Sequence, residues 1–157
     1  MPGFDIVIKN GLIFDGTWVP RYRGDIGIRG GLIAGVGRIS ECDGARVIEA
    51  DGLHVSPGFI DPHTHYDAPL AGFAGRGVLS VGAPAEIVIY DYDNLQVLPS
   101  EIVHDLPGRG WRRVQRARGY RHVLMNGGVT IEKDGETNAY SGRLLRGGAG
   151  IFTGAAA

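Results

Sequence analysis

Short runs that alternate apolar and polar residues, separated by glycine-containing turns, make up most of the chain. From Phe4 to Lys9 the alternation places Phe4, Ile6 and Ile8 on one side, and it leaves Asp5 and Lys9 facing water. That pattern is typical of a half-buried β-strand. Before residue 58 no stretch has a convincing period of 3.6 residues, so strands and not helices are expected there.

Glycine-rich dipeptides mark the turns between these strands. Asn10-Gly11 predicts a tight hairpin turn that returns into a second strand over residues 12–14. Gly30-Gly31 predicts another two-residue turn, which joins a strand at residues 25–29 to one at residues 32–37. A run of β-hairpins folded as a sandwich is therefore expected for the first part of the chain.

The second part of the chain repeats the pattern. Residues 86–91 form a strongly apolar run, and residues 120–125 lead through a glycine turn into residues 129–132. Between them, Trp111 to Ala117 alternates large apolar residues with arginines, which fits a half-exposed strand. These arginines raise the hypothesis of an anion- or partner-binding module. The balanced overall charge favours a solvated sheet face instead.

Composition supports an all-β protein and excludes several function classes. Glycine makes up 27 of the 157 residues, whereas average usage is about 7%, and such a glycine content between short apolar runs indicates many tight turns. Sixteen basic and 17 acidic residues give a net charge of −1, so neither nucleic-acid binding nor a polybasic membrane contact is indicated. No apolar run approaches the ~18 residues of a membrane span, and the start lacks the features of a signal peptide. With one cysteine, Cys42, the sequence predicts a soluble cytoplasmic protein.

The stretch Gly58 to Asp67 contains the candidate chemistry. His63 and His65 are two residues apart and directly follow an apolar strand, so their side chains point to the same side and can converge. Two neutral imidazoles arranged in this way suit a divalent metal such as zinc. Asp61 and Asp67 are candidate carboxylates behind the ligands. The alternative is a pair of surface histidines in a turn.

Several motifs in chain order resemble the amidohydrolase superfamily. They are a strand before Asn10-Gly11, the runs Gly-Asp-Ile-Gly-Ile and Val-Ile-Glu-Ala-Asp-Gly, and Pro-Gly-Phe-Ile-Asp-Pro-His-Thr-His. The segment from Asp61 to Asp67 resembles the N-acyl-D-amino-acid deacylase branch, also known as the D-aminoacylase branch. The resemblance implies a β-sandwich formed by the N-terminal segment, followed by a (β/α)₈ barrel whose first strand ends in the metal-binding His63 and His65. It also implies zinc as the metal.

The chain passes directly from the barrel entry to a segment that resembles the barrel exit, with the join near Leu70-Ala71. A (β/α)₈ barrel needs about 250 residues, and essentially none of them are here. The predicted fold is an all-β, composite β-sandwich built from the N- and C-terminal segments of an amidohydrolase, with the barrel missing. Its predicted parts are residues 1–67, the N-terminal half ending in the His-x-His strand; 68–77, a short junction; 78–146, the C-terminal half; and 147–157, a flexible tail.

This omission limits the expected chemistry. A hydrolytic metal site needs three or more protein ligands and an open position for water. We expect a metal-binding role for His63 and His65 alone, as a vestigial pair, with no catalytic and no other cofactor-binding residue and no stably bound zinc. His54 is expected to be structural, as is the pair His104-Asp105 in a loop before Leu106.

The first functional hypothesis is a non-catalytic β-sandwich module related to metal-dependent amide hydrolases. The second is an active zinc-dependent deacylase of which these residues are only the visible ends, and the third is a small binding module that uses the arginine-rich strand. An N-acyl amino acid substrate is implied only for a full-length enzyme, and neither nucleic acid nor a membrane is an expected partner. Apolar surface that would contact a barrel could drive self-association.

Overall fold

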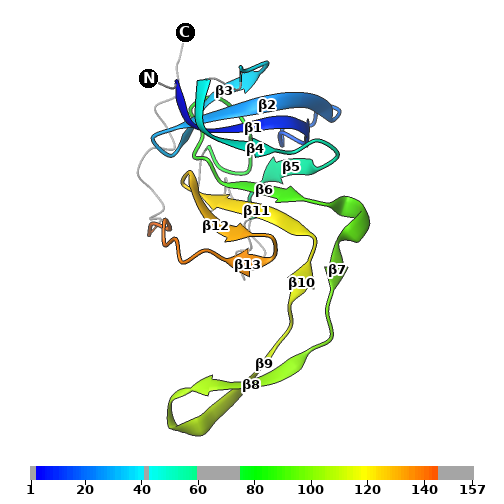
Figure 1. The fold of residues 1–157 in the computed structure, drawn as a ribbon, viewed down its shortest axis with the longest axis vertical. Helices are drawn as coiled ribbons and strands as arrows, with labels where there is room; N and C mark the ends of the chain where they lie inside the picture. The colour runs from blue at the N-terminus through cyan, green and yellow to red at the C-terminus, as the bar shows by residue number, and fades with distance from the viewer. Residues whose placement is uncertain (1–2, 41–42, 60–74, 145–157) are drawn as a thin grey trace, which may run out of the picture.

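The computed structural model describes residues 3–40, 43–59 and 75–144. In this part of the chain, nine strands form one sheet in the order β13-β12-β11-β6-β5-β1-β2-β3, and β4 pairs with β1 (Figure 1). The bounds of these strands are β1 (Phe4–Ile13), β2 (Tyr22–Arg29), β3 (Leu32–Gly37), β4 (Gly44–Glu49), β5 (His54–Pro57), β6 (Ile87–Tyr90), β11 (Tyr120–Met125), β12 (Gly128–Glu132) and β13 (Gly135–Glu136). No α-helix occurs among these residues, so the predicted all-β fold is confirmed.

The two halves of the chain meet at the pairing of β5 with β6. These antiparallel strands match Val55 with Ile89 and Pro57 with Ile87. Strands from both ends of the sequence therefore share one hydrogen-bonded sheet, as the composite fold requires. No helix of the described residues is long and apolar enough to cross a membrane.

One hydrophobic core joins both halves. Isoleucine side chains from the first half pack in the same cluster as side chains from the second, and most of them are fully buried. The largest members are Ile8, Ile13, Ile26, Ile28, Ile33, Ile87, Ile89 and Leu124. Fully burying one such side chain stabilises the folded state by about 1.5–3 kcal/mol, and both halves contribute such side chains to the same core.

The open edge of the sheet is covered by residues that lead into β6. The backbone of Ile33 in β3 donates to Ala83 at 2.9 Å and accepts from Gly82 at 2.8 Å. Gly31 accepts from Ala85 at 2.9 Å, and Ala85 accepts from Gly127 at 3.0 Å. The turn after β2 thus contacts the turn after β11, and the curved sheet closes around its core.

Asn10-Gly11 does not form the predicted hairpin turn. β1 continues to Ile13, and the dipeptide is a bulge at which the pairing with β2 shifts between Ile8 and Gly11. Asn10 does have a positive φ of 59°, as a turn residue would. The chain does not reverse because both sides of β1 are occupied: β2 lies along one side, and β4 and β5 run parallel to β1 along the other.

A narrow two-stranded arm projects from this body (Figure 1). It spans residues 95–118 and consists of β7 (Gln96–Val97), β8 (Glu101–Leu106), β9 (Gly110–Val114) and β10 (Ala117–Arg118). β7 pairs with β10 and β8 with β9, and the short 3₁₀ turn η3 (Pro107–Arg109) forms the tip. Another 3₁₀ turn, η2 (Tyr92–Asn94), precedes the arm.

Candidate functional site

His63 and His65 lie outside the described residues, and so do Asp61, Asp67 and the Leu70-Ala71 join. What the structure does describe are the segments that lead to and from them. Their metal-binding role therefore stays a prediction.

The two ends of this connection meet at one place in the sheet. β5 ends at Pro57, opposite the start of β6 at Ile87, and the backbone of Gly58 donates to Glu86 at 2.8 Å. Arg76 forms a largely buried ion pair with the Glu86 carboxylate. The chain thus leaves and re-enters the sheet on neighbouring strands, which is the geometry that tolerates a large insertion.

His54 lies on β5 within a group of aromatic rings. Its ring stacks on Phe14 at 5.3 Å and on Tyr90 at 5.4 Å, and the ring of Tyr92 is tilted against it at 5.3 Å. Burial raises the pKa of Tyr90, and the neighbouring Tyr92 and Tyr120 add to the rise. These contacts give His54 a packing role, as predicted.

His104 and Asp105 do not act as a pair. Both lie on strand β8 and not in the predicted loop, so their side chains point to opposite faces. Asp105 accepts from Nε and Nη2 of Arg112 at 2.9 and 2.6 Å. Its pKa is lowered chiefly by this hydrogen bonding, which makes Asp105 the partner of an arginine and not of a histidine.

His122 lies beside an acidic residue of the neighbouring strand. Its Nε2 lies 3.4 Å from Oε1 of Glu132 across the β11–β12 ladder, and Arg46 contacts the same oxygen at 3.1 Å. Burial lowers the pKa of His122, and this outweighs the opposing effect of Glu132. The ion pair of Arg46 with Glu132 thus links β4, from the first half of the chain, to β12, from the second.

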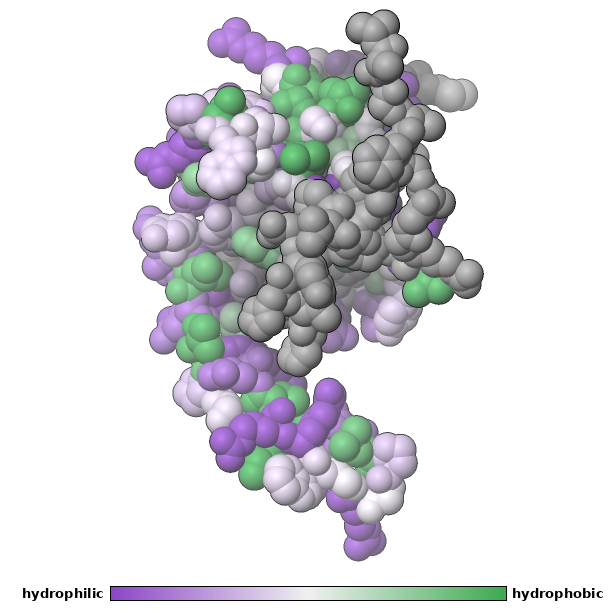
Figure 2. All heavy atoms as spheres, turned by 180° about the vertical axis from the view of Figure 1, so that it is seen from behind, coloured by the Kyte–Doolittle hydropathy of each residue, from purple (hydrophilic) through white to green (hydrophobic). Residues whose placement is uncertain are grey.

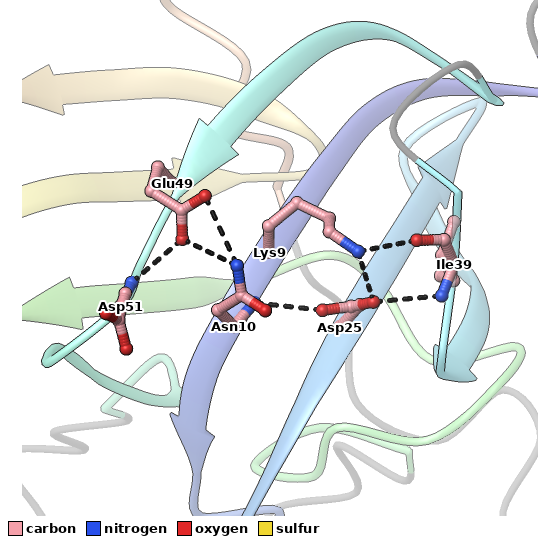
Figure 3. Close-up of polar contacts among 6 residues, drawn as sticks. All are labelled: Lys9, Asn10, Asp25, Ile39, Glu49 and Asp51. Carbon is pink, nitrogen blue, oxygen red and sulfur yellow. Dashed lines mark hydrogen bonds and ion pairs between the residues drawn. The ribbon is translucent and has the colours of Figure 1, made fainter.

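The most buried polar cluster surrounds Asp25, at the bulge of β1 (Figure 3). Asp25 is 5% exposed, and Lys9 Nζ donates to its Oδ2 at 2.6 Å. The backbone N–H groups of Asn10 and Ile39 each donate to the same carboxylate at 2.9 Å. Lys9 is thus largely buried and not solvent-facing as expected, because the bulge turns it toward Asp25.

This cluster borders a hollow of about 520 Å³. Burial acts to raise the pKa of Asp25, but the hydrogen bonds from Asn10, Ile39 and Lys9 outweigh it and lower the pKa. A carboxylate that already accepts three hydrogen bonds is a structural anchor and has little capacity left for a ligand. The sequence carries a weak signal of it: Asp25 directly precedes the apolar run Ile26-Gly27-Ile28.

The described residues do not form a metal centre among themselves. Across residues 3–40, 43–59 and 75–144, no three histidine, cysteine or acidic side chains are close enough to hold a metal ion. His54, His104 and His122 lie on three different strands with separate surroundings. The described donors by themselves therefore do not fit a hydrolytic zinc site.

No family model matches the chain. Among curated proteins, N-acyl-D-glutamate deacylase of Alcaligenes xylosoxydans xylosoxydans is 48% identical over 97 residues, which cover 53% of this chain and 20% of that protein. The D-aminoacylase of the same organism is 42% identical over 64 residues, covering 41% of this chain and 13% of that protein. D-hydantoinase of Geobacillus stearothermophilus is 48% identical over 66 residues, covering 42% of this chain and 14% of that protein.

Solved structures of the same kinds of protein also match. One is N-acyl-D-glutamate deacylase from Bordetella bronchiseptica complexed with zinc and a phosphonate inhibitor, at 43% identity, with 37% of this chain and 12% of that chain covered and a TM-score of 0.36. Another is D-aminoacylase, at 41% identity, with 48% of this chain and 17% of that chain covered and a TM-score of 0.37.

These three relatives of the chain are members of the amidohydrolase superfamily. By name they are D-aminoacylase, N-acyl-D-glutamate deacylase and D-hydantoinase, which confirms the resemblance drawn from the sequence. The chain spans a fifth or less of the length of these three relatives.

Proposed function

We propose that this chain is the β-sandwich portion of a metal-dependent amidohydrolase of the N-acyl-D-amino-acid deacylase type, without catalytic activity of its own. The observation that carries the proposal is the direct pairing of Pro57 with Ile87. Only residues 58–86 connect these two strands, whereas a (β/α)₈ barrel needs about 250 residues. The scaffold is present, and the connection is too short to contain the catalytic domain.

The ligand count supports the same proposal. A catalytic zinc site uses three protein ligands and keeps one position for water. His63 and His65 would supply two, and the described residues contain no group of three histidine, cysteine or acidic side chains that could hold a metal ion by itself. Complete structural zinc sites bind with about 10–16 kcal/mol, so half a ligand set gives roughly 5–8 kcal/mol. That corresponds to a dissociation constant of about 1 μM or weaker.

Zinc titration and an amidase assay on the purified chain test this proposal. We expect weak zinc binding that is lost in a His63→Ala/His65→Ala double variant and kept in His104→Ala, the matched control for an exposed histidine. We expect no hydrolysis of N-acetyl-D-glutamate at any zinc concentration. Turnover that depends on His63 would refute the proposal.

The alternative is an active deacylase in which these residues are the ends of a longer polypeptide. The 48% identity to N-acyl-D-glutamate deacylase favours it. Intact-mass measurement with metal analysis separates the two. A mass near 16.7 kDa without zinc supports the scaffold, and a much larger mass with zinc supports the enzyme.

A further inference from the structure

The arm, residues 95–118, lacks the packing that holds the rest of the sheet together. A two-stranded hairpin alone is marginally stable in water, because it has no second layer to bury its apolar side chains. Figure 2 shows hydrophobic and hydrophilic side chains side by side along the arm. Val97, Ile102 and Trp111 are 67%, 55% and 61% exposed. An arm of this kind gains stability from a partner surface.

The two faces of the arm differ. On one face, Arg112 pairs with Asp105 at 2.6 Å and Arg116 with Glu101 at 3.0 Å, so the acidic residues of the arm are already matched. These pairs also occupy the two arginines on which an anion-binding role would depend.

The other face carries Ile102, Trp111 and Arg113, and is called the Trp111 face below. Ile102 and Arg113 are direct cross-strand partners, and Trp111 lies two residues from Arg113 on the same side. Among the described residues Arg113 makes no ion pair. This face therefore combines exposed apolar area with an arginine that has no acidic partner.

Charge is divided unevenly between the arm and the body. Residues 95–118 contain five arginines and two acidic residues, while the whole chain has a net charge of −1. The body therefore has a net negative charge that complements the arm. A second copy of this chain offers each arm a surface of opposite charge.

A matching surface lies at the base of the arm. A hollow of about 540 Å³ is lined by Ala117, Tyr120 and Ile131, with Asp134 and Glu136 beside them. Arg116 also lines it, and its charge is matched by Glu101 at 3.0 Å. The apolar lining suits a tryptophan, and the two acidic side chains suit an arginine that accompanies it. Trp111 is six residues from Ala117 along extended chain, roughly 20 Å, so the arm does not fill its own hollow.

We propose that two copies of this chain pair by exchanging arms, with the Trp111 face of each copy seated in the hollow at the arm base of the other. Arg113 of one copy then faces Asp134 and Glu136 of its partner. Each copy gives and receives the same contact, so the dimer closes under twofold symmetry. We expect a weak dimer with a dissociation constant on the order of micromolar.

Sedimentation velocity over a range of protein concentrations tests the proposal, and it does not depend on the proposed function. We expect a concentration-dependent dimer that Trp111→Asp and Arg113→Glu each reduce by at least tenfold in affinity. Glu136→Arg should have the same effect. The pair Arg113→Glu/Glu136→Arg should restore association, because the two charges are exchanged. Trp18→Ala is the matched control, since Trp18 is also exposed and lies off the arm.

Fluorescence gives a second readout. The chain has two tryptophans, so a Trp18→Phe variant reports on Trp111 alone. Its emission should shift to the blue as the protein concentration rises, and salt should weaken the shift. A chain that stays monomeric at low salt up to hundreds of micromolar would overturn the proposal. So would a dimer that Trp111→Asp and Arg113→Glu leave intact, because its contacts would then lie elsewhere.

Discussion

Replacing Asp25 by alanine tests whether the buried carboxylate anchors the bulge of β1. The change leaves Lys9, whose side chain is 12% exposed, without its carboxylate. It also leaves the N–H groups of Asn10 and Ile39 without their acceptor. Removing one member of a buried ion pair destabilises proteins by about 3–5 kcal/mol. Lys9 keeps a hydrogen bond to the Ile39 carbonyl at 2.6 Å, so we expect about 3 kcal/mol.

Equilibrium urea unfolding and thermal melting measure this loss. For a domain of this size about 1 kcal/mol shifts Tm by ~2–4 °C, so the expected fall is roughly 6–12 °C. Asp51→Ala is the matched control, because Asp51 pairs with Arg23 at the same 2.6 Å but both side chains are about two-thirds exposed. Water screens that pair, and little change is expected. Equal effects of the two substitutions would show that burial of the carboxylate is not the cause.

The pH dependence of the same variant gives an independent check. The folded-state pKa of Asp25 is lower than its ordinary value, so the unfolded chain binds its proton first as the pH falls. The stabilisation is complete above about pH 5 and is lost as the pH falls below ~4 through the folded-state pKa. The stability difference between wild type and Asp25→Ala should therefore shrink in acid. A constant difference from pH 7 to pH 3 would contradict the assignment.

Two further predictions concern the contacts that close the sheet. Gly31→Ala should destabilise the protein by about 1–3 kcal/mol, because φ is +81° and the added Cβ would lie 2.7 Å from the Asn126 carbonyl oxygen. Gly30 also has a positive φ, but there is open space around it. Gly30→Ala should therefore lose less stability in urea unfolding, and the difference between the two variants measures the contact between the two turns. Burial lowers the folded-state pKa of His122, so stability should fall as the pH drops below ~6.5, and His122→Gln should flatten this part of a Tm-against-pH curve. The pKa of Glu132 is lowered, so this residue titrates at a lower pH than His122. If His122→Gln leaves the slope of Tm against pH unchanged, His122 is not the cause of that slope.

The strands and the Gly30-Gly31 turn could be predicted because their signals are local. A two-residue period defines a strand within a few residues, and Gly30 and Gly31 both have the positive φ that the turn requires. Asn10-Gly11 carries the same local signal, and the prediction was wrong there. The deciding partners are distant in sequence: Asp25 accepts from the Asn10 backbone, and a Cβ on Gly11 would lie 2.5 Å from the Val55 side chain.

The candidate site divides in the same way. The His63–His65 pair could be found from its spacing, but its surroundings depend on residues far away in the sequence and lie outside the described part. The pairing of His104 with Asp105 was set aside from the sequence, and the structure supplies the reason: Asp105 faces Arg112 across the arm. A dipeptide does not show which face of a strand each side chain takes.

The β5–β6 pairing supports the proposal that this sheet forms without an inserted barrel. A domain inserted between two strands adds no hydrogen bonds to the ladder that joins them, so its absence leaves that ladder unchanged. Here the Gly58–Glu86 hydrogen bond extends the ladder one step past Pro57 and Ile87, and Arg76 pairs with Glu86 beside it. The core draws its largest side chains from strands on both sides of the connection. Folding therefore requires β5 and β6 to pair. A short connection favours this pairing, because the entropic cost of closing a loop rises with its length.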